Sequence, residues 1–213
     1  HVIYNGVDLD AFHPRLRDQH RREVRARLGI ADSEMIYLMV GSGFERKGVP
    51  QLLEALARLS DRAARLVVVG HDRRTNALRR RAFALGLGSR VIFAGAQREV
   101  RSWYGAADCF VLPTLYDPFP NAALEAMASG LPVITSPNCG AAEFIVEADN
   151  GFVCDALDIA ALADRMGRIG PAGARTMGER ARAGVAGLGL ATMAGRLMAL
   201  YASLGSPLAP QSS

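Results

Sequence analysis

The sequence predicts an α/β fold built on a doubly wound parallel sheet of six strands. Short apolar runs rich in Val, Ile and Phe alternate with helical stretches along most of the chain. Several of these runs are apolar throughout rather than alternating, which is typical of parallel strands covered on both faces. The chain has 213 residues, half of them hydrophobic, so it is long enough to bury one substantial core.

Each expected element follows from a local pattern of apolar residues. A strand-like run opens the chain at residues 1–4, and after residue 155 the pattern is helical only. We expect one domain over residues 1–200 and a disordered tail over 201–213, where Ser, Pro and Gly dominate. Because the chain begins inside a strand-like run and without Met, we expect it to be part of a longer protein. The further strands are expected at 35–40, 65–70, 90–95, 108–113, 131–136 and 151–155, and the helices between them at 48–59, 74–86, 98–106, 121–129 and 140–147.

The stretch "DPFPNAALEAMASGLPVI" places two carboxylates around the start of one short helix. Pro118 and Pro120 exclude helix before Asn121, which is the expected N-cap. Glu125 lies one step round from the apolar face and points back toward Asp117, because helical side chains lean toward the N-terminus. The helix start suits a phosphate, and the carboxylates suit hydroxyl groups. The alternative is an exposed loop Asp and a helix Glu that only favours the dipole.

A second distinctive loop, "GSGFERKG", follows the strand expected at 35–40. Gly41 and Gly43 permit close backbone approach, and Arg46 and Lys47 supply cations beside a helix start. The loop is not a P-loop, because the order is Lys-Gly and no Ser or Thr follows. It also lacks the dinucleotide fingerprint, because Arg46 stands where the third glycine should be. Since ligands of open parallel sheets bind at the carboxyl ends of strands, we interpret this loop as a phosphate-binding loop of another kind.

The net charge of +4 comes largely from arginines in two helical stretches, residues 15–29 and 73–90. Such runs attract anionic surfaces, but they also occur as ordinary solvated helix faces. No zinc pattern or aromatic RNA-binding motif accompanies them, so we expect no nucleic acid. Peripheral contact with an anionic membrane remains the alternative to a solvated face.

The three cysteines, Cys109, Cys139 and Cys154, are widely spaced among apolar residues. An odd number in such surroundings indicates buried thiols rather than disulfides or a metal site. We therefore expect a reducing, cytoplasmic location, with the inner face of the membrane as the site of any peripheral contact. No apolar run approaches the roughly 20 residues of a membrane span.

Four motifs together resemble the donor-binding, C-terminal half of a GT-B glycosyltransferase of the retaining family numbered four. In order they are "NGVDLDAF", "GSGFERKG", "GAADCFVLPTLYDPFPNAALEAMASGLPVI" and "GFVCDALDIAALADRM". The resemblance covers residue 1 to about 200. Within the family, "GSGFERKG" and "NCGAAEFI" are most similar to glucosyltransferases of the lipopolysaccharide core. The resemblance implies a Rossmann-like domain that binds a UDP-hexose donor, with a missing N-terminal domain that binds the acceptor.

The resemblance also implies roles for charged residues. Arg46 and Lys47, in the loop with Gly41 and Gly43, would bind the diphosphate. Glu125 would accept hydrogen bonds from the ribose hydroxyls. The donor's own phosphate would assist deprotonation of the acceptor, so these cations would stabilise the departing diphosphate.

The resemblance assigns the donor sugar to the loop before the helix. Asp117 would face the sugar, and the backbone amides from Phe119 through Asn121 and Ala122 to Ala123 would line the sugar and phosphates. Asp117 stands where the family usually has Glu, and Pro120 stands where many members have Gly, so we expect a reshaped sugar pocket. Residues 94–99 would carry the base. The pair Asp8 and Asp10 imitates a metal site but belongs to the opening motif, and we expect no metal or other cofactor.

Two rival functions use the same residues. One is a nucleotide-sugar epimerase of GT-B architecture, and the other is a non-catalytic module that binds a nucleotide sugar. A glycosyltransferase would carry a glycine-rich loop and acceptor-binding residues upstream of this chain.

Overall fold

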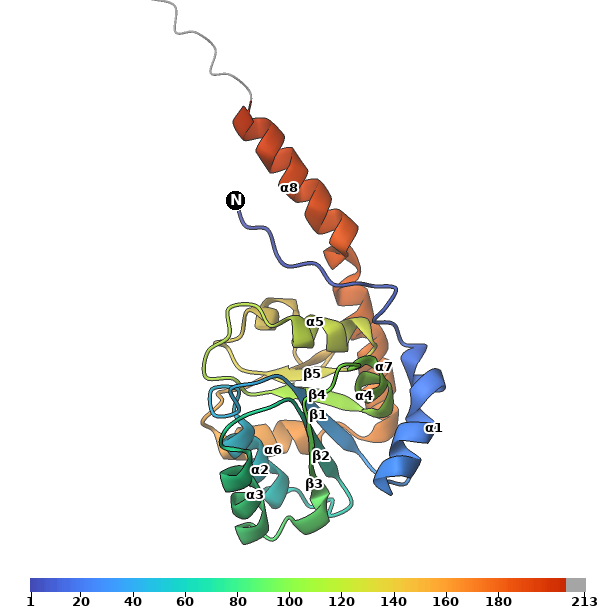
Figure 1. The fold of residues 1–213 in the computed structure, drawn as a ribbon, viewed down its shortest axis with the longest axis vertical. Helices are drawn as coiled ribbons and strands as arrows, with labels where there is room; N and C mark the ends of the chain where they lie inside the picture. Colours follow the sequence, from blue (N-terminus) through green and yellow to red (C-terminus); the bar gives the residue numbers. More distant parts are fainter. Residues whose placement is uncertain (206–213) are drawn as a thin grey trace, which may run out of the picture.

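A computed structural model describes residues 1–205 and shows a parallel sheet with helices on both faces (Figure 1). The six strands follow the order β3-β2-β1-β4-β5-β6, and all neighbouring pairs are parallel. The predicted doubly wound fold is therefore confirmed. The strands are β1 (Ile36–Val40), β2 (Arg65–Val69), β3 (Val91–Gly95), β4 (Cys109–Leu112), β5 (Val133–Thr135) and β6 (Gly151–Val153).

The helices form two layers. α2, α3 and α6 pack together on one face, while α1 packs on α4 and α5 packs on α7 on the other (Figure 1). Their bounds are α1 (Leu16–Leu28), α2 (Val49–Arg58), α3 (Thr75–Ala84), α4 (Arg101–Ala106), α5 (Asn121–Ala128), α6 (Ile159–Gly167), α7 (Pro171–Gly184) and α8 (Leu190–Gly205). Three short 3-10 helices cover Gly88–Arg90, Gly140–Phe144 and Ala186–Leu188.

The core lies where the central strands are covered on both sides. Leu38 and Met39 of β1 and Phe110 of β4 are fully buried, as the unbroken apolar runs predict. The residues of α2 that face this core are Val49, Leu52, Leu53 and Leu56, the predicted stripe.

Three predictions about individual segments are wrong. Residues 1–4 form no strand; they run beside α8, and a single bridge joins Val7 to Gly189 (Figure 1). The segment predicted as helix at 140–147 is the 3-10 helix Gly140–Phe144, followed by extended backbone at Ile145. α8 continues to Gly205, because Ala, Leu and Met favour helix there, so the expected tail does not start at residue 201. The rest of that tail lies outside the described residues.

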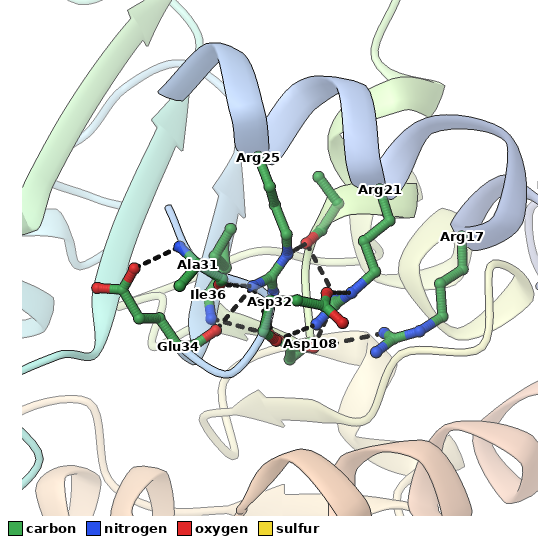
Figure 2. Close-up of polar contacts among 9 residues, drawn as sticks. Arg17, Arg21, Arg25, Ala31, Asp32, Glu34, Ile36 and Asp108 are labelled. Carbon is green, nitrogen blue, oxygen red and sulfur yellow. Dashed lines mark hydrogen bonds and ion pairs between the residues drawn. The ribbon is translucent and has the colours of Figure 1, made fainter. Parts of the chain in front are cut away.

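The arginine run of α1 is not a uniformly solvated face. Arg21 and Arg25 are buried and reach from α1 to Asp108, the residue before β4 (Figure 2). Both guanidinium groups also donate to the carbonyl of Ala106 at the end of α4, at 3.3 and 3.0 Å. Asp108 in turn accepts from the backbone amide of Ile36 at 2.9 Å. Two arginines of this run therefore fasten α1 and α4 to the amino ends of β1 and β4.

Two further predictions concern the cysteines and membrane-spanning helices. Cys109, Cys139 and Cys154 are buried free thiols, as expected. None of the described helices combines the length and apolar character needed to cross a membrane.

Candidate functional site

The strand order places the two predicted loops side by side. β1 and β4 are neighbours at the centre of the sheet. From β1 the chain adds strands toward one edge, and from β4 it adds them toward the other edge, so the strand order reverses between these two strands. The loop after β1 carries Arg46 and Lys47, and the loop after β4 carries Asp117 and leads into α5. This reversal point is where open α/β sheets bind their ligands.

Backbone contacts lock the two loops together. Leu115 donates its amide to the carbonyl of Arg46 at 2.8 Å, and the Thr114 hydroxyl donates to the same carbonyl at 3.0 Å. Gly48, which caps α2 with φ +80°, presses against the second loop: a Cβ there would lie 2.1 Å from the carbonyl oxygen of Pro113. The sequence requires glycine at this point because neither that φ nor that approach admits a side chain.

The basic loop holds its cations in different surroundings. Lys47 lies across Gly41, where a Cβ would come within 2.9 Å of its Cε atom, while Gly43 has open space around it and φ +71°. The side chain of Lys47 is 11% exposed and that of Arg46 is 50% exposed. The side chain of Arg46 is therefore half exposed to solvent, whereas that of Lys47 is largely buried.

The acidic loop meets these cations directly. Lys47 donates to the Asp117 carboxylate at 2.7 Å, and Arg46 lies 3.6 Å from the same oxygen. Arg46 also donates to the carbonyl of Tyr116 at 2.6 Å. The family resemblance assigned Asp117 to the donor sugar, and the sequence did not predict that it pairs with Lys47. Opposite charges pair where little solvent reaches them, and residue spacing alone does not show this pairing.

The loop before α5 is held at both ends. The Asp117 amide donates to the carbonyl of Asn138 and the Gly140 amide donates to the carbonyl of Asp117, both at 3.0 Å. Gly140 allows this contact, because a Cβ there would lie 1.8 Å from the carbonyl oxygen of Pro118. Phe119 packs with Tyr4 and Phe144, with ring centroids 5.1 and 5.9 Å away. The three aromatic rings therefore tie this loop to the N-terminal segment and to the 3-10 helix Gly140–Phe144.

Asn121 does not cap the helix as predicted. It is the first residue of α5, the cap position belongs to Pro120, and no side chain caps the helix. The Asn121 side chain instead accepts from the Asn5 amide at 3.1 Å, a partner that is distant in sequence.

The backbone amides at the start of α5 are only partly available. The amide of Ala123 donates to the carbonyl of Pro120 at 3.1 Å, so it is engaged within the turn. Within the described part of the chain, no acceptor is paired with the amides of Phe119, Asn121 or Ala122. Of the four amides in the predicted set, three are therefore without a hydrogen-bond partner among the described residues, and two of these, from Asn121 and Ala122, belong to the first turn of α5.

Glu125 is not the ordinary surface residue that its position on the helix indicates. It is half-buried, and its Oε2 accepts from the hydroxyl of Tyr104 at 2.8 Å. Burial raises the pKa of Glu125, and the Tyr104 hydrogen bond opposes that rise. Tyr104 is not predictable as a partner of Glu125 from the sequence, because it lies 21 residues away in a short helix whose apolar pattern accounts for the tyrosine as a core residue.

The segment expected to carry the base lies at the same edge of the sheet. Gly95 ends β3, and beside it a hollow of about 370 Å³ extends to Gly70 and Arg79. Arg79 stacks over the Phe93 ring, with its guanidinium carbon 5.5 Å from the ring centroid. The structure thus places an open space next to residues 94–99.

The acidic pair in the opening motif has a local role. The Asp8 carboxylate accepts from the backbone amides of Asp10 and Ala11, at 3.0 and 2.9 Å. The described residues contain no group of three or more His, Cys, Asp or Glu side chains arranged to hold a metal ion.

The fold and the paired loops define a Rossmann-like domain of the kind that forms one half of GT-B glycosyltransferases. The model of the family described as glycosyl transferases group 1 matches residues 20–182, and the chain belongs to that family.

Three known proteins illustrate the similarity. The lipopolysaccharide glucosyltransferase WaaG of Escherichia coli is 38% identical over 157 residues, which cover 71% of this chain and 41% of WaaG. The sucrose-phosphate synthase of Thermosynechococcus elongatus has a solved structure with a TM-score of 0.82 and 32% identity, covering 96% of this chain and 52% of that one. The separately crystallised C-terminal domain of a glycosyl transferase group 1 family protein from Francisella tularensis has a TM-score of 0.73 and 25% identity, covering 84% of this chain and 96% of that domain. The chain spans 38–41% of the length of the first curated relatives it matches.

Proposed function

We propose that this chain is the donor-binding half of a retaining hexosyltransferase that uses a UDP-sugar of the UDP-glucose type. The observation that carries the proposal is that Arg46 and Lys47 meet Asp117 at the reversal point between β1 and β4, just before the helix that carries Glu125. The similarity to WaaG favours a saccharide or lipopolysaccharide-core acceptor, bound mainly by a preceding domain. The expected setting is the cytoplasm, at the inner face of the membrane where an acceptor lipid would be anchored.

Each group has a defined part in this proposal. Arg46 and Lys47, together with the free amides at the start of α5, bind the diphosphate and stabilise the charge that develops on it as the sugar leaves. Asp117, held by Lys47, accepts from a sugar hydroxyl, and Glu125 accepts from the ribose. The proposal assigns no step to a metal ion, so removal of divalent cations with a chelator is expected to leave nucleotide affinity unchanged.

The proposal is tested by calorimetric titration of the chain with UDP, GDP, uridine and the corresponding UDP-sugars. UDP is expected to bind more tightly than GDP and far more tightly than uridine. Tighter binding of GDP would overturn the choice of base, and no binding of any nucleotide would overturn the function.

The diphosphate contact is tested with Arg46→Ala. A charge-assisted hydrogen bond contributes about 1.5–3 kcal/mol, so affinity for UDP should fall roughly tenfold or more while affinity for uridine stays constant. Arg80→Ala, which removes an exposed arginine from α3, is the matched control and should change neither. Equal losses for UDP and uridine would show that Arg46 does not contact phosphate.

A further inference from the structure

Tyr104 holds one oxygen of the Glu125 carboxylate and leaves the other accessible. Its hydroxyl donates to Oε2 at 2.8 Å, and among the described residues it is the donor that reaches this carboxylate. Among the described residues, the buried side-chain oxygens and nitrogens without a hydrogen-bond partner are Gln51 Oε1 and Arg165 Nε, and Glu125 Oε1 is not one of them. Oε1 of Glu125 is therefore not sealed in the core. A carboxylate offers about four acceptor positions, so most of them remain for a ligand.

Tyr104 itself is immobilised by its surroundings. It is 1% exposed, and its ring packs against Phe12 and Phe110 with centroids 5.7 and 6.2 Å away. Its neighbour Gly105 lies against α1, where a Cβ would stand 2.2 Å from the carbonyl oxygen of Leu16.

The end of the helix that carries Tyr104 is also fixed. Arg21 and Arg25 both donate to the carbonyl of Ala106, and both pair with Asp108 (Figure 2). The hydroxyl of Tyr104 is thus delivered from a rigid part of the fold rather than from a loop.

We propose that Tyr104 is a positioning residue that fixes the Glu125 carboxylate in the orientation that accepts from the ribose hydroxyls of the donor nucleotide. The proposal rests on the function proposed above for Glu125. A glutamate on a helix surface has several rotamers of similar energy, and ordering it for a ligand costs conformational entropy. A hydrogen bond to Oε2 supplies that order before the ligand arrives, which is the general basis of preorganised binding.

The same bond keeps the carboxylate charged. Burial raises the pKa of Glu125, and the hydrogen bond from Tyr104 lowers it again. On α7, which packs on α5, Arg182 is engaged with the carbonyls of Phe12, Leu9 and Ala128. Removing the Tyr104 hydroxyl should therefore raise the pKa of Glu125 further, and the charged acceptor should be lost at a higher pH.

The experiment compares Tyr104→Phe with Tyr37→Phe. Tyr37 is also buried, at 2% exposure, and donates to the carbonyl of Met166 at 2.7 Å, so its variant loses a similar hydrogen bond far from Glu125. Tyr104→Phe is expected to lower UDP affinity by roughly threefold to tenfold, because it removes the hydrogen bond that holds one oxygen of the Glu125 carboxylate. It should also move the acid side of the binding profile to higher pH. Tyr37→Phe should lower thermal stability without either change. Near-ultraviolet circular dichroism establishes that each variant is folded.

Two reference measurements separate this proposal from the function on which it rests. UDP with a 2′,3′-dideoxy ribose should bind wild type and Tyr104→Phe equally, because it has no ribose hydroxyl to donate to the carboxylate that Tyr104 orients. In a Glu125→Gln background, Tyr104→Phe should cost little further affinity, because a residue that acts through Glu125 is not additive with it.

The outcomes divide clearly. If Glu125→Gln weakens UDP binding but Tyr104→Phe changes neither affinity nor pH profile, the positioning role is wrong and the proposed function stands. Equal weakening of UDP and its dideoxy analogue by Tyr104→Phe would reveal a general structural effect and would also overturn the role. If the wild type does not discriminate UDP from the dideoxy analogue, the assignment of Glu125 to the ribose fails first.

Discussion

Glu125 differs from a solvated helix glutamate because the fold removes part of its water and supplies one hydroxyl donor. Both effects are set by α4 and by the packing of α5, so neither is visible in the segment around Glu125. The residue combines a raised cost of ionisation with a fixed geometry, which is the combination expected of a binding group rather than a stabilising one.

Glu125→Gln is expected to weaken UDP binding roughly tenfold, since a neutral amide oxygen accepts weaker hydrogen bonds than a carboxylate. Its effect on stability should depend on pH. Because burial raises the pKa of Glu125, the folded chain binds this proton more tightly than the unfolded chain, and ionisation costs stability as pH rises through the folded pKa. The glutamine variant should therefore gain stability over wild type at neutral pH and lose that gain in acid.

Urea denaturation of both proteins at neutral and acid pH measures this difference, and calorimetry measures the affinity. If the stability difference between Glu125→Gln and wild type favours the variant more in acid than at neutral pH, the pKa of Glu125 is not raised by folding and the prediction is wrong. Equal weakening of UDP and its dideoxy analogue would contradict the ribose contact.

α1 and α4 owe their placement to a buried cluster of charges rather than to apolar packing alone. The side chains of Arg25 and Asp108 are 3% and 1% exposed, and both arginines bond to Asp108. Desolvating such a cluster opposes folding, but once the cluster has formed, removing any one member lowers the free energy of unfolding strongly, because its partners stay buried without a counter-charge.

Asp108→Ala is expected to lower the free energy of unfolding by about 3–5 kcal/mol, because it leaves buried Arg25 without a carboxylate partner and Arg21 with only the exposed carboxylate of Asp32. Glu23→Gln is the matched control. It removes an exposed acid from α1, the helix that carries Arg21 and Arg25, and should change stability by no more than about 0.5 kcal/mol. Chemical denaturation measures both. A loss below about 1 kcal/mol for Asp108→Ala would mean that water, not the ion cluster, satisfies these arginines.

Gly140→Ala tests how the acidic loop is held. The added Cβ would lie 1.8 Å from the carbonyl oxygen of Pro118, so the loop that carries Asp117 must move. We expect a loss of stability of about 1–3 kcal/mol, as for other overpacked sites, together with weaker binding of UDP-sugars. Gly173→Ala in α7 has open space around the new methyl group and should be neutral or stabilising by up to about 1 kcal/mol. Similar melting temperatures for the two variants would show that the loop near Gly140 can move to make room for a methyl group without loss of stability.

At the scale of the whole molecule, Arg46, Lys47 and Asp117 lie together in the loops that follow β1 and β4, and Glu125 lies on the helix that comes next. The chain matches about half of the solved sucrose-phosphate synthase structure but nearly all of the separate Francisella tularensis domain. A domain of this extent can therefore fold alone in this family.

We predict that the purified chain binds UDP but transfers no hexose. A catalyst that positions two substrates gains much of its rate from orientation, and this gain vanishes when one binding surface is missing. Calorimetry for binding and a radiolabelled transfer assay with a lipid-linked saccharide acceptor provide the two measurements. Turnover by the chain alone would contradict the prediction, while absence of both binding and turnover would contradict the proposed function.

The sequence by itself determined the class of fold and the composition of the site. Unbroken apolar runs separated by helical stretches can be buried only in a doubly covered parallel sheet, so the six strands were predictable within a few residues. One short motif, residues 41–48, contains Gly41, Gly43, Arg46 and Lys47. A second short stretch contains both prolines that precede α5 and Glu125 within the helix. These features depend on neighbours along the chain, which a sequence displays directly.

Only the tertiary structure decided which partners these groups have. Asp117 pairs with Lys47 across 70 positions, Glu125 bonds to Tyr104 across 21, and Arg25 is drawn inward to Asp108 across 83. Strand order brings these residues together, and their charges then settle where burial makes an unpaired group most costly. A one-dimensional pattern specifies which faces are apolar, but the partner of a buried charge is set by which loops and helices meet in space. This is why the sequence predicted Asn121 as a cap and did not predict that Arg21 and Arg25 of α1 turn inward, although the fold that contains them was predicted correctly.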